Sequence, residues 1–600
     1  LDSQGGNVLM QSANLLVPSG ALTISGQQVS IKDSSLDVAH PSTTGGVIEI
    51  GGPQLSLQNT HLNASGGDGG GTIHLGGGFQ GAPLHSGAPR ATLTTVDSST
   101  TLRSDALLQG NGGEIVVWAD DTTSFSGTLS SRGGPSGGSG GDMEVSGSRR
   151  LLFSGRADGS AADGTPGSLL LDPRNLTIVA GDSASGSVSL TPQNPNLLSS
   201  DNAAQDDSIS AANVVAILQT GTDVQLQASE DITVLAAIQD ANNNELIPAG
   251  GLRLDAGGAV DVQAPIHAGS VELNGGSRGV RISAPIRTNA DIVITGTNSA
   301  TPDPSAPSGN RHSGINIAST GSLTSQQGSI RLHGQSEIST ANDAGMGITI
   351  GGDILAAGDI QISGRGGAGE GGQQSVGINL DSENLSGQIT SQSGSIDLQG
   401  IGGNGTGLNN DGIDIKGYTL NAANNLTIEA RAGLGLDRFG LYTQDTTLRA
   451  GGTFQISGYS SQGSIESKDF GIYSLNTDFF SDGAGGLTDT NMIRGEVALN
   501  SSLPFSSLST GIWIEGRERR STIRTASDLF IEGRTGEAYF SFGTALWSID
   551  ITTGGGSPHS ARPSSLRING TGGSTLDTFI WPDPNILGDS LLTCLLYTSP

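Results

Sequence analysis

The chain has 600 residues, of which 95 are glycine, 4% aromatic and 14% charged, so it encodes neither an ordinary globular core nor an ordinary charged surface. The formal net charge is −29, and the only lysines are Lys32, Lys416 and Lys468. Such a surface repels phosphate, which excludes electrostatic binding to nucleic acid or anionic lipid. Cys594 is the single cysteine, so no internal disulfide can form. No apolar run approaches the roughly eighteen residues of a membrane span, and we expect no transmembrane segment.

Short segments with alternating apolar positions recur from the first residues onward, closed by Gly, Asn, Asp or Ser. Period-two alternation turns one side of a strand toward a core and the other toward water. A spacing of about 8–12 residues between strands also suits sandwiches and barrels, so the architecture must be decided by repetition. Clear examples are the segments 48–50, 73–75, 224–226, 232–234, 260–262, 271–273 and 280–282.

A Gly-(Ile/Leu)-x-hydrophobic signature provides that repetition in the second half. Each copy is followed by a middle strand, such as 388–390, and by a third strand, such as 394–398. Three short strands in a unit of about 31 residues indicate one turn of a solenoid. We therefore predict an all-β protein, a parallel β-helix with Gly-rich corners. The signature begins at Gly314, Gly347, Gly377 and Gly412, with looser copies at Gly440, Gly471 and Gly511.

One short helix is predicted near 210–220. Ser210 can cap it, the apolar residues of 214–218 form one face, and Gly221 can end it. Composition shifts divide the rest of the chain. We expect a β-helix segment at 1–175, a linker at 176–208, a β-helix segment with the helix at 209–298, a Pro-rich linker at 299–312, a repeat β-solenoid at 313–588 and a non-native tail at 589–600.

Residues 1–295 carry a set of motifs that resembles the filamentous-haemagglutinin-like large exoproteins of two-partner secretion. The motifs are GGEIVVWADDTT at 112–123, FSG at 125–127, SRGG at 131–134, GGDMEVSG at 140–147, GSLLLDPRNLTI at 167–178 and the helix region 208–234. The resemblance implies a right-handed parallel β-helix that leaves the cell through an outer-membrane pore-type transporter. We expect a fragment that lacks the amino-terminal secretion domain engaging this pore, and a secreted or bacterial cell-surface location.

Motifs typical of catalysis and metal binding lack their structural context. The G-x-S-x-G match at 137–141 and the G-x-G-x-x-G match at 364–369 have no following helix. The stretch 137–145 approximates a Ca²⁺-binding nonapeptide with Asp142 as ligand, but it lacks tandem copies. The paired carboxylates Asp120–Asp121 and Asp206–Asp207 are adjacent and need not face one cleft. The histidines show no H-E-x-x-H and no close Cys/His pairing, so no zinc site is supported; they are His40, His61, His74, His85, His267, His312, His333 and His559.

We therefore assign no catalytic, cofactor-binding or metal-ligating residue from the sequence and expect no cofactor and no enzymatic activity. The first hypothesis is an adhesin-like structural protein that attaches to cells, surfaces or matrix, with glycans or proteins as partners. The alternatives are a carbohydrate-active β-helix enzyme, a polysaccharide lyase or glycosidase, and a haem-binding exoprotein. We expect the aromatic residues of the carboxy-terminal half to pack in the core; they are Phe479, Phe480, Trp513, Phe530, Tyr539, Phe540, Phe542, Trp547 and Trp581.

Overall fold

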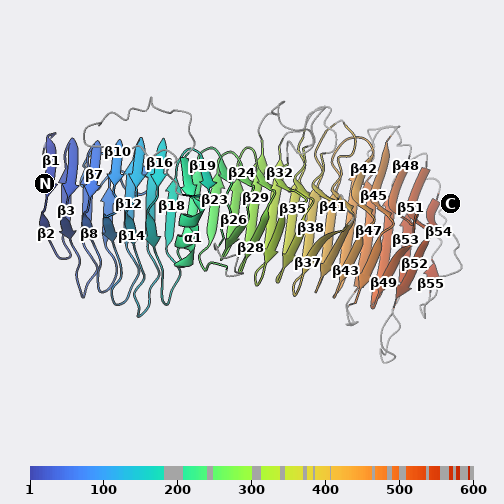
Figure 1. The fold of residues 1–600 in the computed structure, drawn as a ribbon. Helices are drawn as coiled ribbons and strands as arrows, with labels where there is room; N and C mark the ends of the chain where they lie inside the picture. The colour runs from blue at the N-terminus through green and yellow to red at the C-terminus, as the bar shows by residue number, and fades with distance from the viewer. Residues whose placement is uncertain are drawn as a thin grey trace. The chain divides into compact units, whose positions relative to one another are not determined.

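A computed structural model describes residues 1–3, 5–181, 207–239, 247–299, 313–337, 345–368, 375–382, 386–405, 407–461, 467–482, 490–498, 508–535, 540–553, 566–571, 576–580 and 592–594. Strand makes up about 58% of the described residues and helix about 3%. The chain divides into two compact units, unit 1 at Leu1–Asn274 and unit 2 at Gly275–Pro600. The predicted all-β parallel β-helix is confirmed, because in each unit the strands of successive coils lie side by side (Figure 1).

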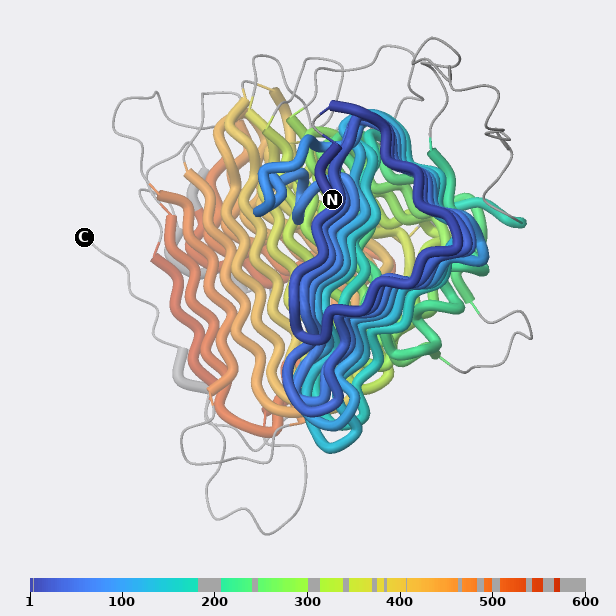
Figure 2. Tube along the Cα trace, turned by 90° about the vertical axis from the view of Figure 1, so that its left-hand side faces the viewer, coloured from blue at the N-terminus to red at the C-terminus, as the bar shows by residue number. Residues whose placement is uncertain are grey.

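The first six coils of unit 1 each contribute one strand to each of three parallel sheets, and Figure 2 shows these coils, blue to cyan, superposed along the coil axis. Sheet 1A contains β1 (Asn7–Gln11), β4 (Gln28–Lys32), β7 (Gln54–Gln58), β10 (Leu93–Val96), β13 (Thr122–Phe125) and β16 (Arg150–Phe153). Sheet 1B contains β2 (Asn14–Leu16), β5 (Ser35–Asp37), β8 (His61–Asn63), β11 (Thr101–Arg103), β14 (Thr128–Ser130) and β17 (Arg156–Asp158). Sheet 1C contains β3 (Ala21–Ser25), β6 (Val47–Gly51), β9 (Thr72–Leu75), β12 (Glu114–Ala119), β15 (Asp142–Gly147), β18 (Ser168–Asp172), β21 (Asp223–Ala228), β23 (Leu252–Ala256) and β26 (Val271–Gly275).

The last part of unit 1 holds the predicted helix. Helix α1 (Ala211–Gln219) begins after Ser210, which holds the N-cap position but makes no capping hydrogen bond with its side chain; the apolar face of the helix is buried as predicted. Gly221, just beyond its end, has a φ of 91°, a conformation that favours glycine. Strands β20 (Asp207–Ser210), β19 (Leu176–Val179), β22 (Ile232–Val234) and β24 (Val260–Val262) pair in that order, and β25 (Ile266–Ala268) follows.

Unit 2 repeats the three-sheet pattern with longer strands. Sheet 2A contains β27 (Val280–Ile282), β30 (Ile315–Ile317), β33 (Ile348–Ile350), β36 (Ile378–Asp381), β39 (Ile413–Lys416), β42 (Arg438–Gln444), β45 (Lys468–Leu475), β48 (Leu508–Glu515), β51 (Phe540–Trp547) and β54 (Leu576–Ile580). Sheet 2B contains β28 (Pro285–Thr288), β31 (Ser322–Ser325), β34 (Asp353–Ala356), β37 (Gly387–Ser391), β40 (Tyr418–Ala422), β43 (Thr447–Ala450), β46 (Asp478–Ser481), β49 (Ser521–Thr525) and β52 (Ile549–Thr553). Sheet 2C contains β29 (Ile292–Asn298), β32 (Ile330–Ser336), β35 (Ile360–Arg365), β38 (Ile396–Ile401), β41 (Leu426–Arg431), β44 (Phe454–Ser461), β47 (Thr490–Ala498), β50 (Asp528–Thr535), β53 (Leu566–Thr571) and β55 (Leu592–Cys594).

The core of unit 2 is built from columns of aliphatic side chains in parallel register. Alternation along each strand sends every second residue inward, and parallel pairing stacks those residues on their counterparts in the next coil. One such column is buried throughout. Each of its side chains is covered by its counterparts in the coils on either side, so a short apolar strand is stable only beside its neighbours. Its members are Ile294, Leu332, Ile362, Leu398, Ile428, Ile456, Ile493, Ile531 and Ile568.

Glycine is required where sheet 2C turns toward the next strand of sheet 2A. A Cβ on Gly364, in β35, would lie 2.1 Å from the carbonyl oxygen of Gly377, the glycine that precedes β36. A Cβ on Gly377 would in turn lie 2.4 Å from the backbone nitrogen of Ile401. The glycine signature therefore repeats because the backbones of two strands pass so close together at these positions that a side chain would not fit. Ala430 occupies the equivalent position in β41, so one coil accommodates a methyl group.

Only part of each predicted linker and of the predicted tail lies among the described residues. Residues 176–179, at the start of the predicted linker 176–208, form β19, and residues 182–206 lie outside the described residues. The Pro-rich linker 299–312 is described only at residue 299. Of the predicted tail 589–600, only Leu592–Cys594 is described, as β55 beside β53. In the described ranges no helix combines the length and the apolar character that crossing a bilayer requires.

Candidate functional site

A long loop covers the outer surface of sheet 1C. Residues 76–92 join β9 to β10, whereas the equivalent connections in adjacent coils are the dipeptides 52–53 and 120–121. This 76–92 loop includes the short 3₁₀ turn Phe79–Gly81. Outward-facing side chains beneath it are therefore buried although strand alternation points them away from the coil interior.

Three contacts fix the loop on the sheet, and a fourth, from Arg90 to Gly81, lies within the loop. A Cβ on Gly81 would lie 2.6 Å from the indole of Trp118, so the loop backbone packs directly on that ring. The amide of Gln80 donates to Glu144 Oε2 at 2.7 Å. Arg90 donates to the carbonyl of Gly81 at 2.6 Å and pairs with Asp120 at 3.3 Å. The loop is thus an ordered part of unit 1, with backbone amides and a guanidinium group aimed at sheet 1C.

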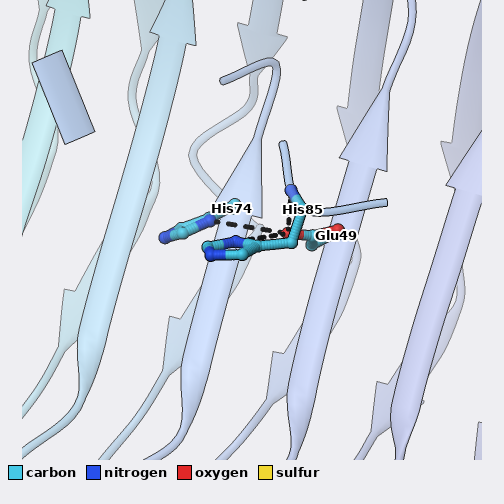
Figure 3. A group of neighbouring side chains, drawn as sticks. All are labelled: Glu49, His74 and His85. Atoms are coloured by element: carbon cyan, nitrogen blue, oxygen red, sulfur yellow. Dashed lines mark hydrogen bonds and ion pairs between the residues drawn. The ribbon is translucent and has the colours of Figure 1, made fainter. Parts of the chain in front are cut away.

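Glu49, His74 and His85 meet under this loop (Figure 3). Glu49 on β6 and His74 on β9 are register partners on adjacent coils, and both are buried. His85 belongs to the loop, and its side chain is 90% exposed. Nδ1 of His74 lies 3.9 Å from Glu49 Oε1, and Nδ1 of His85 lies 3.4 Å from the same oxygen. One potential ligand atom from each residue lies within 4.8 Å of the others.

Glu114, at the start of β12, orients His74 from the opposite side. Its Oε1 lies 2.5 Å from His74 Nε2. An ionised carboxylate only accepts hydrogen bonds, so Nε2 carries the proton of this contact. In the neutral ring Nδ1 then presents a lone pair toward Glu49. That nitrogen is buried and makes no hydrogen bond within the described part of the chain.

Hydrogen bonds and the nearby histidine favour the ionised forms of Glu49 and Glu114. Burial raises the pKa of Glu49, but hydrogen bonds from Ser86 and His85 and the nearby His74 outweigh burial and lower it overall. The hydrogen bond from His74 lowers the pKa of Glu114. Burial instead raises the pKa of Glu144, farther along the sheet. The group is therefore a negative, partly dehydrated position open to water on the His85 side.

A second feature, in unit 2, is an aromatic ladder on the outer surface of sheet 2A. Neighbouring rings have centroids 5.1–6.4 Å apart, and the rings of Tyr442 and Tyr473 stack at 5.7 Å with an interplanar angle of 8°. Phe470 is buried, and the other members are half-buried. The ladder spans four consecutive strands and consists of Phe439, Tyr442, Phe470, Tyr473, Trp513 and Phe542.

Polar groups border this ladder. Arg517 donates to the Tyr473 hydroxyl at 3.0 Å and to Glu515 at 2.9 Å. The indole nitrogen of Trp513 donates to Glu515 at 3.1 Å. Burial raises the pKa of Tyr442 to about 12, so its phenol stays neutral in any physiological solution. The surface thus combines flat apolar rings with fixed hydrogen-bonding groups at their edges.

The expectation that the carboxy-terminal aromatics fill the core is wrong for most of the described residues. Phe479 is buried, but Phe480, Trp513, Phe530 and Phe542 are half-buried and Trp547 is 41% exposed. Strand parity is the reason, since Trp513 alternates with the inward-facing Ile512 and Ile514. Tyr539, Phe540 and Trp581 lie among the residues whose side chains are not described.

The carboxylate pairs singled out from the sequence have separate partners. Asp120 accepts from Trp118 and pairs with Arg90, whereas Asp121 faces Arg149 at 3.9 Å. Asp207 is buried and accepts from the amide of Leu151, and residue 206 is not described. These carboxylates do not converge on one position.

A carboxylate pair that sequence reasoning missed is Asp411 and Asp414. Both side chains are buried, and burial raises the pKa of both. Asp411 also accepts from the amide of Phe439, a member of the aromatic ladder. Glycoside hydrolysis uses carboxyl groups held about 5 Å or more apart, with substrate between them. A buried pair leaves no such space for a substrate and fits a structural role better.

The remaining motifs have ordinary structural surroundings. The G-x-S-x-G match at 137–141 runs directly into β15, and Gly364 of the G-x-G-x-x-G match lies within β35. Asp142, which occupies the ligand position of the calcium-like nonapeptide, is exposed and accepts from Ser168 Oγ at 2.8 Å. His312 and His559 lie outside the described residues.

Sequence spacing gave no reason to group Glu49, His74 and His85, because the first two are joined by strand register and the third by a loop. Aligning the strands 48–50 and 73–75 in register is the signal that pairs Glu49 with His74. The chain matches no protein-family model and no curated protein sequence. The fold and these two features define it as a parallel β-helix protein with a histidine–carboxylate group at the 76–92 loop and an outward-facing, half-buried aromatic ladder.

Proposed function

We propose that this chain is part of an adhesin-like structural protein of the filamentous-haemagglutinin-like, two-partner secretion class, secreted or displayed on a bacterial surface. The motifs within residues 1–295 support the class, and the stacked coils suit a rigid support for contact surfaces. On this proposal, export uses an outer-membrane pore-type transporter, and the chain itself binds rather than catalyses.

The aromatic ladder is the observation that carries the attachment role. Half-buried aromatic residues on consecutive strands are unusual for a purely structural surface, because a solvent-facing strand position is ordinarily polar. Flat rings bordered by Glu515 and Arg517 complement a sugar, whose ring has an apolar C–H face and hydroxyl groups around its edge. We therefore propose cell-surface or matrix glycans as the partners of this ladder.

A glycan array probed with the full chain tests this role. Binding to one glycan class is expected, with Trp513→Ala and Tyr473→Ala each weakening it about tenfold or more. Phe530→Ala is the matched control, since that half-buried ring lies on sheet 2C, away from the ladder. Equal losses in all three variants, or no glycan binding, would remove the basis of the proposal. Release of reducing ends from a bound polysaccharide would establish a carbohydrate-active enzyme instead.

A further inference from the structure

We propose that Glu49, His74 and His85 form a binding site for a divalent transition-metal ion of the zinc type, which fastens the 76–92 loop to sheet 1C. This site lies in unit 1 and does not depend on the glycan-binding proposal. The argument begins with His74, whose Nδ1 is buried, has no hydrogen bond within the described residues and faces a carboxylate.

Two electron-rich atoms that face each other in a partly dehydrated position are stabilised by a positive charge between them. Glu114 takes the proton on Nε2 of His74, which leaves the lone pair on Nδ1 directed toward Glu49 Oε1. A metal ion between these atoms would turn their repulsion into two bonds. Histidine ligands in zinc sites characteristically donate their second ring nitrogen to a carboxylate, the role that Glu114 fills here.

The distances suit a small tetrahedral ion. Ligands about 2.1 Å from zinc in a tetrahedron lie about 3.4 Å from each other. His85 Nδ1 lies 3.4 Å from Glu49 Oε1, and His74 Nδ1 lies 3.9 Å from it. All three donor atoms lie within 4.8 Å of one another, so the ligands must draw closer around the ion, and His85 can move because its side chain is exposed.

The donor set identifies the class of ion. Two imidazole nitrogens and one carboxylate favour zinc and its neighbours in the transition series over calcium and magnesium, which prefer all-oxygen surroundings. Three protein ligands leave a fourth position for water on the solvent side, where His85 is exposed. The amides of His85 and Ser86 already hold Glu49 at 3.0 and 2.8 Å, so the carboxylate is preorganised.

Isothermal titration of the full chain with Zn²⁺ tests the site, and Co²⁺ supplies a spectroscopic readout. We expect one ion per chain and, with Co²⁺, the intense visible absorption of a tetrahedral complex. His85→Ala, an exposed change that leaves the fold intact, should weaken binding at least tenfold and abolish the absorption. Glu114→Gln, which alters only the orienting carboxylate, should weaken binding about tenfold.

His61→Ala is the control, because His61 is an exposed histidine of unit 1 bonded to Thr101 outside the group. It should bind Zn²⁺ like the parent chain. Hydrogen exchange adds a test of the fastening role, with slower exchange of the 76–92 loop amides expected when Zn²⁺ is present. Unchanged binding in His85→Ala, an equal loss in His61→Ala, or the absence of stoichiometric binding would overturn the proposal.

Discussion

Leu398→Ala in β38 tests whether the aliphatic column carries the stability of unit 2. Leu398 is fully buried between its register partners Ile362 and Ile428. The change deletes three carbon groups, each contributing about 0.8 kcal/mol, and leaves a cavity that raises the total to about 3–4 kcal/mol. Neighbouring coils should share the loss, because each depends on the next for its backbone pairing.

The assay is urea unfolding of the full chain followed by circular dichroism, with hydrogen exchange to locate the change. Faster exchange is expected in β35, β38 and β41, and the transition of unit 2 should move to lower urea. Gln399→Ala is the matched control, since Gln399 is the exposed next residue on the same strand, and it should change stability by less than about 0.5 kcal/mol. Equal effects of the two substitutions would refute the stacked-column reasoning.

Three further changes test other parts of the structure by the same unfolding assay. Gly364→Ala places a methyl group against a backbone carbonyl and should cost about 1–3 kcal/mol. Arg438→Met removes the guanidinium that pairs with the carboxylate of Asp469; because the two side chains are 2% and 0% exposed, the loss should cost about 3–5 kcal/mol. Burial raises the pKa of Asp172 to about 6 from an ordinary 3.8, so its ionisation opposes folding. Stability therefore falls as pH rises from about 4 to 6, and Asp172→Asn should add about 1–2 kcal/mol at pH 8 and nothing at pH 4.

Each change has its own control. Ala430→Gly is the control for Gly364→Ala, because it removes a methyl group from the equivalent position in β41. A fall of more than about 1 kcal/mol in the free energy of unfolding would contradict the argument that the close backbone crossing requires glycine. Arg449→Met breaks an exposed pair with Asp482 and should cost less than about 1 kcal/mol, so a loss as large as that of Arg438→Met would show that burial is not decisive. A gain from Asp172→Asn that is the same at both pH values would exclude titration as its cause.

The repeat architecture could be predicted from the sequence because one local pattern determines it many times over. Inward positions such as Ile348 and Ile378 repeat with the coil, and the preceding glycines mark the crossings that need no side chain. The helix was predictable from Ser210, Gly221 and the apolar face between them. These features depend on neighbours in sequence or on period alone.

The two candidate sites depend on which side of its strand each residue faces, on the register between paired strands and on the path of the 76–92 loop. The alternation of inward and outward side chains along a strand places Trp513 outward, between the inward-facing Ile512 and Ile514. The same alternation, read from the sequence, predicts an outward position for Trp513 and not a place in the core. Register pairs Glu49 with His74. His85 could not be placed, because the 76–92 loop has no periodic pattern and folds back through individual contacts.

The most direct test of the coil stacking is a pair of electron–electron distances between spin labels on sheet 2C, with Cys594 replaced by serine. Labels at Arg331 and Gln455 lie four coils apart in register, and labels at Arg331 and Met492 lie five coils apart. A parallel strand spacing of about 4.8 Å predicts distances of about 19 and 24 Å. Narrow distributions separated by about one strand spacing would support the parallel β-helix, whereas broad distributions, or distances that do not grow from one pair to the next, would contradict it.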